Sequence, residues 1–457
     1  MELAKNKQYT VIGLGASGMA AVRYLHSLGL NVSVSESRSG GQMNAAELDV
    51  LKKLNIPFET GGHTWDFVGK ADLIIPSPGV PLTLPVLKKA REEGIAVGGE
   101  LALAAGEFSA PVIGVTGSNG KTTVTSLIGH LLQVAGRKVF VGGNIGTPML
   151  EYLQSEQDAD VVVLELSSFQ LEISGEFRPD IGLFLNISPD HLDRHGTMEN
   201  YVSAKRRIFE YQGSADIAIL GADDNEIMHE HVVSAGTVLR FGSQPDFEAR
   251  VTKHGVTLAG SIQGAQEEYD LENTSLSSPV NRLNAAAAIL AARSLGCDPA
   301  AIRKGLACYD PPEHRMALVR EIDGVRYVDD SKATNIGAVA AALTSSGNQV
   351  ILIGGGRDKG SDFSLLRPVV QKYAKGVVLI GESAERMAQE LEPLVRVYRA
   401  ESMEEAVTIA NETAQSGDTV LLSPGCASFD MFTSYAHRGQ VFQDAVLSLC
   451  SVNQECC

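Results

Sequence analysis

The sequence predicts an α/β protein of three domains. Three stretches of the chain alternate short apolar strands with amphipathic helices, and each contains a glycine-rich turn directly after a strand. The chain has 457 residues, a length that fits three domains of roughly 100–200 residues each. Hydrophobic residues make up 44% and charged residues 20%, which excludes a disordered or collagen-like chain.

The first domain is predicted to be Rossmann-like and to span residues 1–99. From Tyr9 the chain reads as a strand, the turn GLGASG, and a helix with Val22, Leu25 and Leu28 on one face. The strand NVSVSES follows and completes a βαβ unit. Similar units continue until EFSAP at residues 107–111 interrupts the pattern.

The turn of this βαβ unit has the spacing of a diphosphate site. Gly13, Gly15 and Gly18 lie between strand and helix, where backbone N–H groups and a helix N-terminus can meet phosphate oxygens. Glu36 ends the next strand, about where a ribose-binding acid would lie. A dinucleotide and a UDP-type diphosphate both fit, and a purely structural turn is the alternative.

The central domain is predicted to span residues 100–311 around a mostly parallel sheet. The strand in PVIGVTG begins it, and the strands at residues 161–165 and 181–186 are apolar throughout, as strands buried on both faces are. Residues 242–280 are polar and glycine-rich, which favours a small antiparallel insertion. An alanine-rich helix is expected at residues 285–295.

The central domain carries a variant P-loop. TGSNGKTT at residues 116–123 follows a strand and precedes a helix with apolar residues at 124, 127, 128 and 131. Its backbone amides can wrap phosphate oxygens, with Lys121 on the terminal phosphates and the hydroxyl of Thr122 or Thr123 on Mg²⁺. The usual glycine is replaced by Val115.

Polar residues follow the next two strands of the central domain. Glu165 ends one strand, at the sheet edge where ligands of α/β proteins bind. The other strand leads into ISPDHLDRH, where one histidine is the expected metal ligand, and a loop of capping residues is the alternative. Lys205 lies on a predicted helix at residues 201–209, where a solvated lysine is the default interpretation.

The third domain is predicted to be Rossmann-like and to span residues 312–457. Two prolines in CYDPPEHR suit a hinge at its start, and the strands in QVILIGGG, GVVLIGE and TVLLSPG alternate with helices. The polar clusters at residues 313–315, 329–335, 355–363 and 423–430 place Lys and Arg beside glycine turns, which indicates a carboxylate and phosphate site.

Charge, cysteine usage and hydropathy limit the partners and the compartment. The formal net charge of −17 argues against nucleic acid and anionic membranes as partners. The six cysteines include no Cys-x-x-Cys pair, and the pair Cys456 and Cys457 is interpreted as a frayed tail. Because no run of about 18 apolar residues and no signal segment occurs, we expect a cytoplasmic protein without integral membrane contact.

The order of these motifs resembles the ATP-dependent Mur ligases of peptidoglycan synthesis. TGSNGKTT, GGNIG, LELSSFQLE, DHLDRH, YVSAK, NRLNAAAA, EHR, DDSKATN and SPGCASFD span nearly the whole chain. Within that family, GLGASG, the SPG at residues 77–79, LELSSFQLE and SPGCASFD are most similar to the members that add D-glutamate. Val115 is typical of that family.

The resemblance implies an ATP-dependent amide ligase that acts in cell wall synthesis. The carboxylate of UDP-N-acetylmuramoyl-L-alanine would be phosphorylated by ATP, and the amine of D-glutamate would attack the acyl phosphate. The implied cofactors are ATP, two Mg²⁺ ions and a lysine carbamate. A monomer is expected, with hinge closure around Pro311 and Pro312 on substrate binding.

The resemblance also implies a role for individual residues. The expected catalytic residues are Lys121, Asn144, His191 and Lys205, and the expected metal ligands are Thr122, Glu165, His191 and Lys205 as its carbamate. ATP contacts are implied for Gly117, Ser118, Asn119, Gly120, Lys121, Thr122, Thr123, Asn281, Asn284, Arg315 and Asp330. Contacts to the UDP-linked substrate are implied for Gly15, Ala16, Ser17, Gly18, Glu36, Ser37, Arg38, Ser77, Gly79, Asn144, Ser167 and Gln170. D-Glutamate contacts are implied for Lys332, Thr334, Lys359, Ser428 and Phe429.

Three alternatives stay open from the sequence. An NAD-dependent dehydrogenase would use GLGASG but would leave TGSNGKTT and DHLDRH without a role. A sister ligase that adds L-alanine, a diamino acid or a folate glutamate would share the central motifs. A nonenzymatic ATP-binding switch protein would hydrolyse ATP slowly without a ligation product.

Overall fold

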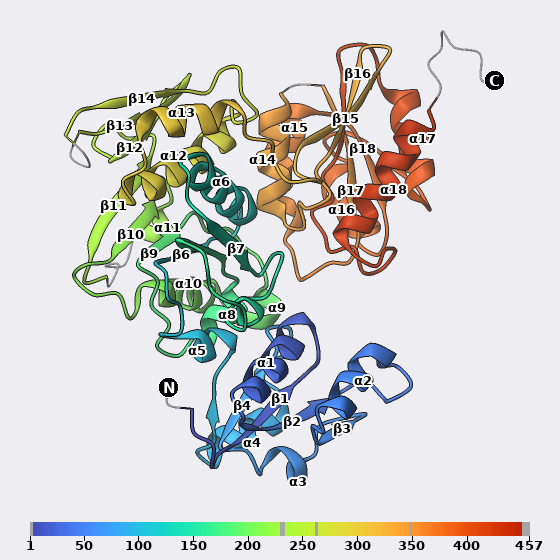
Figure 1. Cartoon of the computed structure of the whole chain (residues 1–457). Coiled ribbons are helices and arrows are strands. Elements are labelled where there is room, and N and C mark those ends of the chain that lie inside the picture. Colours follow the sequence, from blue (N-terminus) through green and yellow to red (C-terminus); the bar gives the residue numbers. More distant parts are fainter. Residues whose placement is uncertain (1–2, 229–233, 261–263, 348, 450–457) are drawn as a thin grey trace. The chain divides into compact units, whose positions relative to one another are not determined.

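The computed structural model describes residues 3–228, 234–260, 264–347 and 349–449 (Figure 1). These residues form two compact units. The first unit comprises residues 1–186, 199–274 and 283–308, and the second comprises residues 187–198, 275–282 and 309–457. Two of the three sheets lie in the first unit and one lies in the second. The predicted α/β class is confirmed.

The first sheet is parallel throughout, with the strand order β3-β2-β1-β4-β5. Its apolar core includes Ile12, Ile74 and Leu87, with Trp65 packed against it. Leu28 does not share the buried face of the first helix: the helix ends at Ser27, and Leu28 is 42% exposed. The elements are β1 (Gln8–Ile12), α1 (Ala16–Ser27), β2 (Asn31–Glu36), α2 (Ala45–Lys53), β3 (Phe58–Thr60), α3 (Trp65–Val68), β4 (Leu73–Pro76), α4 (Pro85–Glu92) and β5 (Ala96–Val97).

The second sheet has nine strands in the order β14-β13-β12-β11-β10-β9-β6-β8-β7. It is parallel from β7 to β12, and the pairs β12–β13 and β13–β14 are antiparallel, which confirms the predicted insertion. The strands are β6 (Val112–Thr116), β7 (Val139–Gly143), β8 (Val161–Glu165), β9 (Ile181–Phe184), β10 (Ile217–Gly221), β11 (Thr237–Gly242), β12 (Ala249–Val251), β13 (Gly255–Leu258) and β14 (Glu267–Asp270).

Some helices of the central region begin at a residue that favours a helix start. α12 (Pro279–Ser294) begins six residues before the expected alanine-rich stretch, because Pro279 is suited to a first helical position. The others are α5 (Glu100–Ala104), α6 (Lys121–Val134), α7 (Met149–Tyr152), α8 (Ser168–Glu172), α9 (Leu192–His195), α10 (Met198–Arg206), η1 (Arg207–Phe209), α11 (Asn225–Met228) and α13 (Pro299–Ala307).

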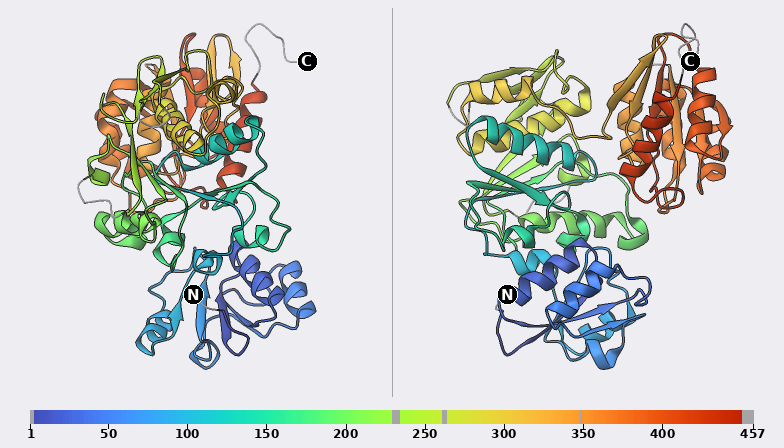
Figure 2. Two further views of the ribbon diagram at one scale, coloured as in Figure 1. Left: turned by 60° about the vertical axis from the view of Figure 1, so that its left-hand side comes forward. Right: turned by 45° about the vertical axis from the view of Figure 1, so that its right-hand side comes forward.

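The third sheet has six strands in the order β15-β16-β20-β17-β18-β19, and only its edge strand β15 pairs antiparallel. Apolar cores cover both faces, one beneath α14, α15 and α16 and the other beneath α17 and α18 (Figure 2). The elements are β15 (Ala317–Ile322), β16 (Val325–Asp329), α14 (Ile336–Ser346), β17 (Val350–Gly355), η2 (Phe363–Leu366), α15 (Arg367–Tyr373), β18 (Ala374–Ile380), α16 (Ala384–Leu391), β19 (Arg396–Arg399), α17 (Met403–Thr413), β20 (Thr419–Leu422) and α18 (Tyr435–Leu447).

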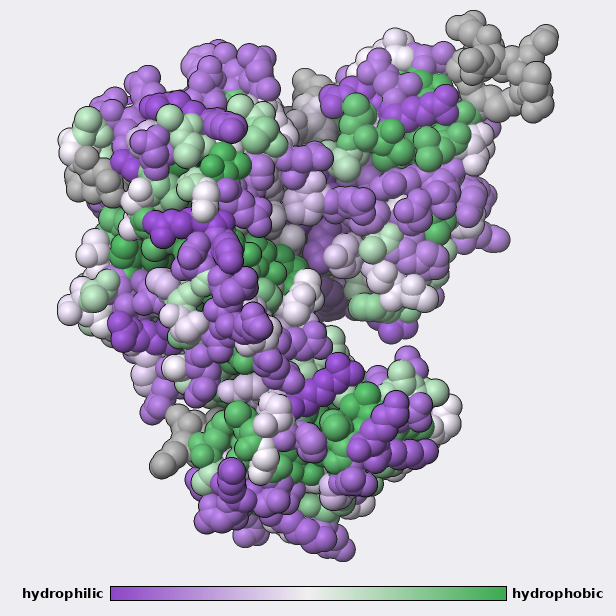
Figure 3. All heavy atoms as spheres, in the orientation of Figure 1, coloured by the Kyte–Doolittle hydropathy of each residue, from purple (hydrophilic) through white to green (hydrophobic). Residues whose placement is uncertain are grey.

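Hydrophilic residues dominate the visible face of both units (Figure 3). Among the described residues, none of the helices is long and apolar enough to cross a membrane. Cys297, Cys308 and Cys426 are free thiols. The cysteines at 450, 456 and 457, which include the expected tail pair, lie outside the described part of the chain.

Candidate active site

The glycine turn after β1 is tight and leads into an exposed helix N-terminus. Gly13 has a φ of +83°, and a Cβ on Gly18 would lie 2.1 Å from the carbonyl oxygen of Gly13. The Ser77 hydroxyl donates to that same carbonyl at 2.7 Å. Gly15 and Ala16 are exposed at the start of α1. The turn therefore presents the first backbone N–H groups of a twelve-residue helix, which suits a phosphate group.

Glu36 holds this turn in place. Its buried carboxylate accepts from the Leu14 N–H at 2.8 Å, the Arg38 N–H at 2.9 Å and the Arg38 side chain at 3.0 Å. Burial alone would raise the pKa of Glu36, but these hydrogen bonds and the Arg38 charge lower it to about 2. Both carboxylate oxygens are thus engaged within the protein, so a contact to ribose stays a prediction. Ser37 is exposed beside it.

The P-loop joins β6 to α6 through two glycines with positive φ. Gly117 has a φ of +154°, and Gly120, with a φ of +82°, caps α6. Asn186, just beyond β9, fixes the loop: its side chain accepts from the Asn119 N–H at 2.8 Å and its backbone carbonyl accepts from the Ser118 N–H at 2.9 Å. The Lys121 ammonium lies over the loop and donates to the carbonyls of Gly117 and Ser118, each at 2.8 Å.

Glu165 lies beside the P-loop at the carboxyl end of β8. Its carboxylate is buried and accepts from the Thr122 hydroxyl at 2.6 Å and from the Asn144 side chain at 2.9 Å. Gly143 has a φ of +98°, and a Cβ there would lie 2.5 Å from the Glu165 carbonyl, so the GGN turn can approach only without a side chain. These oxygen donors match the preference of Mg²⁺.

Lys205 is not the solvated helix lysine that its sequence pattern alone favours. It is 1% exposed on α10, and its ammonium donates to the Gly117 carbonyl at 2.8 Å. The ammonium also lies 4.7 Å from the centre of the Tyr201 ring. A lysine held in this way against the P-loop belongs to the site rather than to the surface.

A pocket of about 380 Å³ lies next to the P-loop within the first unit. Asn186 and Asn284 line it, and the side-chain oxygen of Asn284 would lie 2.4 Å from a Cβ on Gly120. Sequence reasoning missed its acidic rim, formed by residues 223–226, although the polar run ADDNE after the apolar strand at 217–221 was a usable signal. Asn281 falls in the second unit and donates to the Ser275 carbonyl at 3.2 Å.

The second unit contains the DHLDRH segment. Asp190 accepts from the Asn335 side chain at 3.0 Å, and its carboxylate lies 3.6 Å from the Lys359 ammonium. His191 has a left-handed φ of +54°, and its side chain lies 3.6 Å from the Asp190 carboxylate. The structure thus brings the expected D-glutamate ligand Lys359 to this segment. His191 lies in a different unit from Glu165 and Lys205.

The expected D-glutamate residues and the expected ATP contact Asp330 lie in loops at the third sheet. The Lys332 ammonium lies 3.6 Å from the centre of the Tyr435 ring. Ser428 is buried, whereas Phe429 is 65% exposed. Burial raises the pKa of Asp330 to about 7, although the Arg315 charge and the Ser423 hydroxyl, which donates at 3.0 Å, lower it.

Arg438 joins two of these loops and was missed by sequence reasoning. Its guanidinium is 1% exposed and donates to the Ser331 hydroxyl at 3.0 Å, the Ser331 carbonyl at 2.8 Å and the Cys426 carbonyl at 3.0 Å. The DDSKATN and SPGCASFD segments are therefore held by one fork-shaped side chain. Arg438 lies on a C-terminal helix and belongs to no recognisable motif, so its role could not be predicted from a single sequence.

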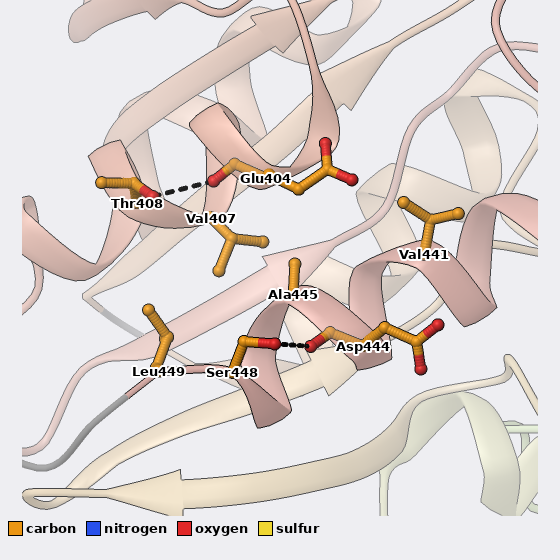
Figure 4. Close-up of a pocket in the computed structure, with 8 residues that line it drawn as sticks. All are labelled: Glu404, Val407, Thr408, Val441, Asp444, Ala445, Ser448 and Leu449. Atoms are coloured by element: carbon orange, nitrogen blue, oxygen red, sulfur yellow. Dashed lines mark hydrogen bonds between the residues drawn. The ribbon is translucent and has the colours of Figure 1, made fainter. Parts of the chain in front are cut away.

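A second pocket, of about 390 Å³, lies between α17 and α18 (Figure 4). The hydroxyls of Thr408 and Ser448 donate to the backbone carbonyls of Glu404 and Asp444 on their own helices, at 2.9 and 2.8 Å. The pocket walls also include Val407, and its polar groups do not converge on one point. We therefore place the candidate site at the P-loop.

Among the described residues, no group of three or more His, Cys, Asp or Glu side chains is arranged to hold a metal ion. A metal at the P-loop would therefore depend on phosphate oxygens as well as on Glu165 and Thr122. In the first unit, Lys121, Thr122, Asn144, Glu165 and Lys205 converge around one loop. This arrangement defines a phosphate-handling α/β enzyme.

Family models match all three parts of the chain. A Mur ligase MurD-like N-terminal domain matches residues 7–99, a Mur ligase middle domain matches residues 115–292, and a Mur ligase glutamate ligase domain matches residues 314–426. The chain belongs to the Mur ligase family, as the motif order predicted. The domain boundaries at 99/100 and 311/312 stay a prediction.

Relatives agree with this assignment, and a solved structure is similar in fold. The UDP-N-acetylmuramoylalanine–D-glutamate ligase of Desulfotalea psychrophila is 45% identical over 98% of this chain and 97% of that protein. The ligase of the same name from Syntrophotalea carbinolica is 41% identical over 97% and 98%. The crystal structure of UDP-N-acetylmuramate-alanine ligase from Thermotoga maritima is similar in fold, with a TM-score of 0.60, 21% identity and coverage of 97% of this chain and 100% of that one.

Proposed function

We propose that the protein is an ATP-dependent ligase that adds D-glutamate to UDP-N-acetylmuramoyl-L-alanine through an acyl phosphate. The observation that carries this proposal is the match, at 40–45% identity and nearly full length, to relatives named for that reaction. The site geometry agrees, because the P-loop, Glu165 and a buried lysine suit transfer of a phosphoryl group from ATP.

The P-loop residues have separate tasks in this reaction. Lys121 donates to two carbonyl oxygens. When ATP binds, phosphate oxygens can accept these hydrogen bonds instead, and the Lys121 ammonium then offsets their negative charge. Glu165 and Thr122 would hold Mg²⁺, which would supply positive charge to the phosphates. Asn144 donates to Glu165 and is exposed on its other side, so it can reach the substrate carboxylate. A poor acyl donor thereby gains a phosphate leaving group.

We further propose that Lys205 acts as a carbamate in the active enzyme. Its burial and its position against Gly117 support this role, because a carbamate would turn a buried ammonium into an oxygen ligand for a second Mg²⁺. His191 would serve as a further ligand. The pocket beside Asn284 would receive the nucleotide base, with Asn281, Arg315 and Asp330 as additional ATP contacts.

The two substrates would bind at opposite ends of the chain sequence. The uridine-diphosphate end of UDP-N-acetylmuramoyl-L-alanine is assigned to the glycine turn with Ser77 and Gly79. The sugar-peptide end of the same substrate is assigned to Ser167 and Gln170. D-Glutamate is assigned to Lys332, Lys359, Thr334, Ser428 and Phe429, because a dicarboxylate needs two cations. We propose that the protein works as a cytoplasmic monomer.

Phosphate release and product mass test this proposal together. Purified protein is incubated with ATP, Mg²⁺ and UDP-N-acetylmuramoyl-L-alanine, and with D-glutamate, L-glutamate, L-alanine, L-lysine or meso-diaminopimelate. We expect turnover with D-glutamate alone and a product heavier by one glutamyl residue. Turnover with another amino acid would identify a sister ligase, and absence of turnover in folded protein would contradict the proposal.

A further inference from the structure

Glu100 is a buried carboxyl group that the roles above do not use. It is 3% exposed and begins α5, where the chain passes from the first sheet to the second. The preceding Gly99 donates its N–H to the Ile173 carbonyl at 2.8 Å, and a Cβ on Gly99 would lie 2.9 Å from the Ile173 side chain. Glu100 is therefore held firmly against the segment that follows α8.

One oxygen of Glu100 joins two segments assigned to the UDP-linked substrate. Its Oε1 accepts from the Gln170 side-chain amide at 2.6 Å and from the Ser17 hydroxyl at 3.2 Å. Ser17 lies in the first turn of α1, directly after the glycine turn. Gln170 lies on α8, which follows the strand that ends in Glu165. The carboxyl group thus links the diphosphate turn to the catalytic end of β8.

Glu100 and Ser167 engage opposite ends of the Gln170 side-chain amide. The Gln170 side-chain oxygen accepts from the Ser167 N–H at 2.8 Å and from the Ser167 hydroxyl at 2.9 Å. An amide has a donor end and an acceptor end, so an acceptor at Glu100 keeps the acceptor end on Ser167. Loss of the Glu100 oxygen would leave the Gln170 NH₂ group without this acceptor, so its side chain would be held from one end only, and the Ser17 hydroxyl would be free to turn.

The other oxygen of Glu100, Oε2, is buried and has no hydrogen-bond partner among the described residues. Burial raises the pKa of Glu100, while the hydrogen bonds from Gln170 and Ser17 lower it. A buried carboxyl oxygen without a hydrogen bond lowers the stability of the folded protein, and an apolar residue at position 100 would not have this cost. A role in positioning substrate-binding groups accounts for a carboxyl group here.

We infer that Glu100 is a positioning residue for the UDP-linked substrate, which fixes the Ser17 hydroxyl and the Gln170 amide that receive it. The inference rests on the proposed function. Glu100 does not touch the P-loop residues described above, so its contribution concerns binding of this one substrate. ATP and D-glutamate should bind independently of it.

The test uses two perturbing variants, one rescuing variant and one control in the full-length protein. Glu100→Met keeps the side-chain size but removes the carboxyl acceptor. Glu100→Asp shortens the side chain by one methylene group and so moves the carboxyl group away from Ser17 and Gln170. Glu100→Gln retains an acceptor oxygen. Ser174→Ala is the control, because Ser174 is 1% exposed after α8 and its hydroxyl has no hydrogen-bond partner in the described part of the chain.

Steady-state kinetics with each substrate varied in turn supply the readout, with calorimetric titration of UDP-N-acetylmuramoyl-L-alanine as a direct binding measurement. For Glu100→Met we expect KM and Kd for this substrate to rise about tenfold, because a tenfold change corresponds to the free energy of one strong hydrogen bond. KM for ATP and D-glutamate should change less than about twofold. Glu100→Asp should show the same selectivity, and Glu100→Gln and Ser174→Ala should stay near wild type.

Unchanged KM in Glu100→Met, or a rise in all three KM values together, would overturn the inference. If Glu100→Met does not fold, as judged by circular dichroism, Glu100→Asp decides by the same criteria. A wild-type protein without D-glutamate turnover would instead contradict the proposed function. The two failures are therefore distinguishable.

Discussion

Replacement of Glu36 by glutamine should loosen the glycine turn. The carboxylate accepts from the backbone N–H groups of Leu14 and Arg38 and from the Arg38 side chain, all within 3.0 Å. An amide retains one acceptor oxygen but places an NH₂ group where two donors now converge. Glu36→Gln therefore removes a charge and leaves at least one buried donor without a partner.

The magnitude follows from the pKa of Glu36. The pKa is lowered from 4.5 to about 2, so the ionised carboxylate stabilises the folded form. At 1.36 kcal/mol per pKa unit, this difference amounts to about 3 kcal/mol. The contribution is fully present above pH 4.5 and is lost as the pH falls toward 2, because protons then bind the unfolded chain first. At pH 3, less than half of it should remain.

The single tryptophan of the chain makes this effect measurable in the intact protein. Trp65 lies on α3 and packs against the apolar core of the first sheet, so its fluorescence reports unfolding of that sheet. With a urea slope of about 1–3 kcal/mol per molar, a loss of about 3 kcal/mol in Glu36→Gln should lower the unfolding midpoint by about 1–3 M at pH 7. Asp49→Asn, which changes an exposed carboxylate on α2, serves as the charge-matched control and should leave the midpoint in place.

Two results would refute this reasoning. One is a Glu36→Gln midpoint equal to that of the wild type at pH 7. The other is a difference between variant and wild type that does not shrink at pH 3. Either would mean that the hydrogen bonds to Glu36 do not favour its ionised form.

Three further variants test the remaining roles. Lys121→Ala should lower kcat by about 10³-fold or more with an unchanged circular dichroism spectrum, and near-normal ligation would remove the P-loop assignment. Lys205→Ala should lose activity that short carboxylates partly restore, and gentle intact-mass measurement of the wild type should show the carbamate; full activity of the variant would contradict this role. Arg438→Lys should raise KM for D-glutamate about tenfold, because lysine cannot reach Ser331 and Cys426 together. An unchanged KM for D-glutamate would mean that the DDSKATN and SPGCASFD loops keep their positions without the Arg438 guanidinium.

Local patterns predicted the fold class and the P-loop because both depend on short stretches of sequence. The apolar strand that ends at residue 116 and the glycines at 117 and 120 indicate a strand, a turn and a helix start within one short stretch. Glu165 was likewise predictable, since the end of an apolar parallel strand lies at the ligand-binding edge of the sheet. In each case sequence neighbours are also spatial neighbours.

The contacts that local sequence patterns could not indicate join residues that are distant in sequence. The position of Glu36 at a strand end suggested a ribose contact, which stays a prediction, but it gave no sign of the hydrogen bond that the carboxylate accepts from Leu14, 22 residues away. The local helical pattern of Lys205 favoured a solvated lysine, whereas the family resemblance implied a site residue, and the structure places its ammonium against Gly117, 88 residues away. Glu100 and Arg438 belong to the same class, since each ties together segments that no local pattern relates.

Because the chain is acidic, the site must bind its anionic substrates through cations that lie close to them. The formal net charge is −17, yet ATP, the UDP-linked substrate and D-glutamate are all anions, so the long-range field does not draw them in. Affinity must come from cations held at short range, where salt screens them little. Lys121 rests on backbone carbonyls and Lys332 on the Tyr435 ring, both neutral groups that an anionic oxygen can replace at small electrostatic cost. Lys121 and Lys332 can therefore meet anionic substrates at short range within a protein whose net charge is negative.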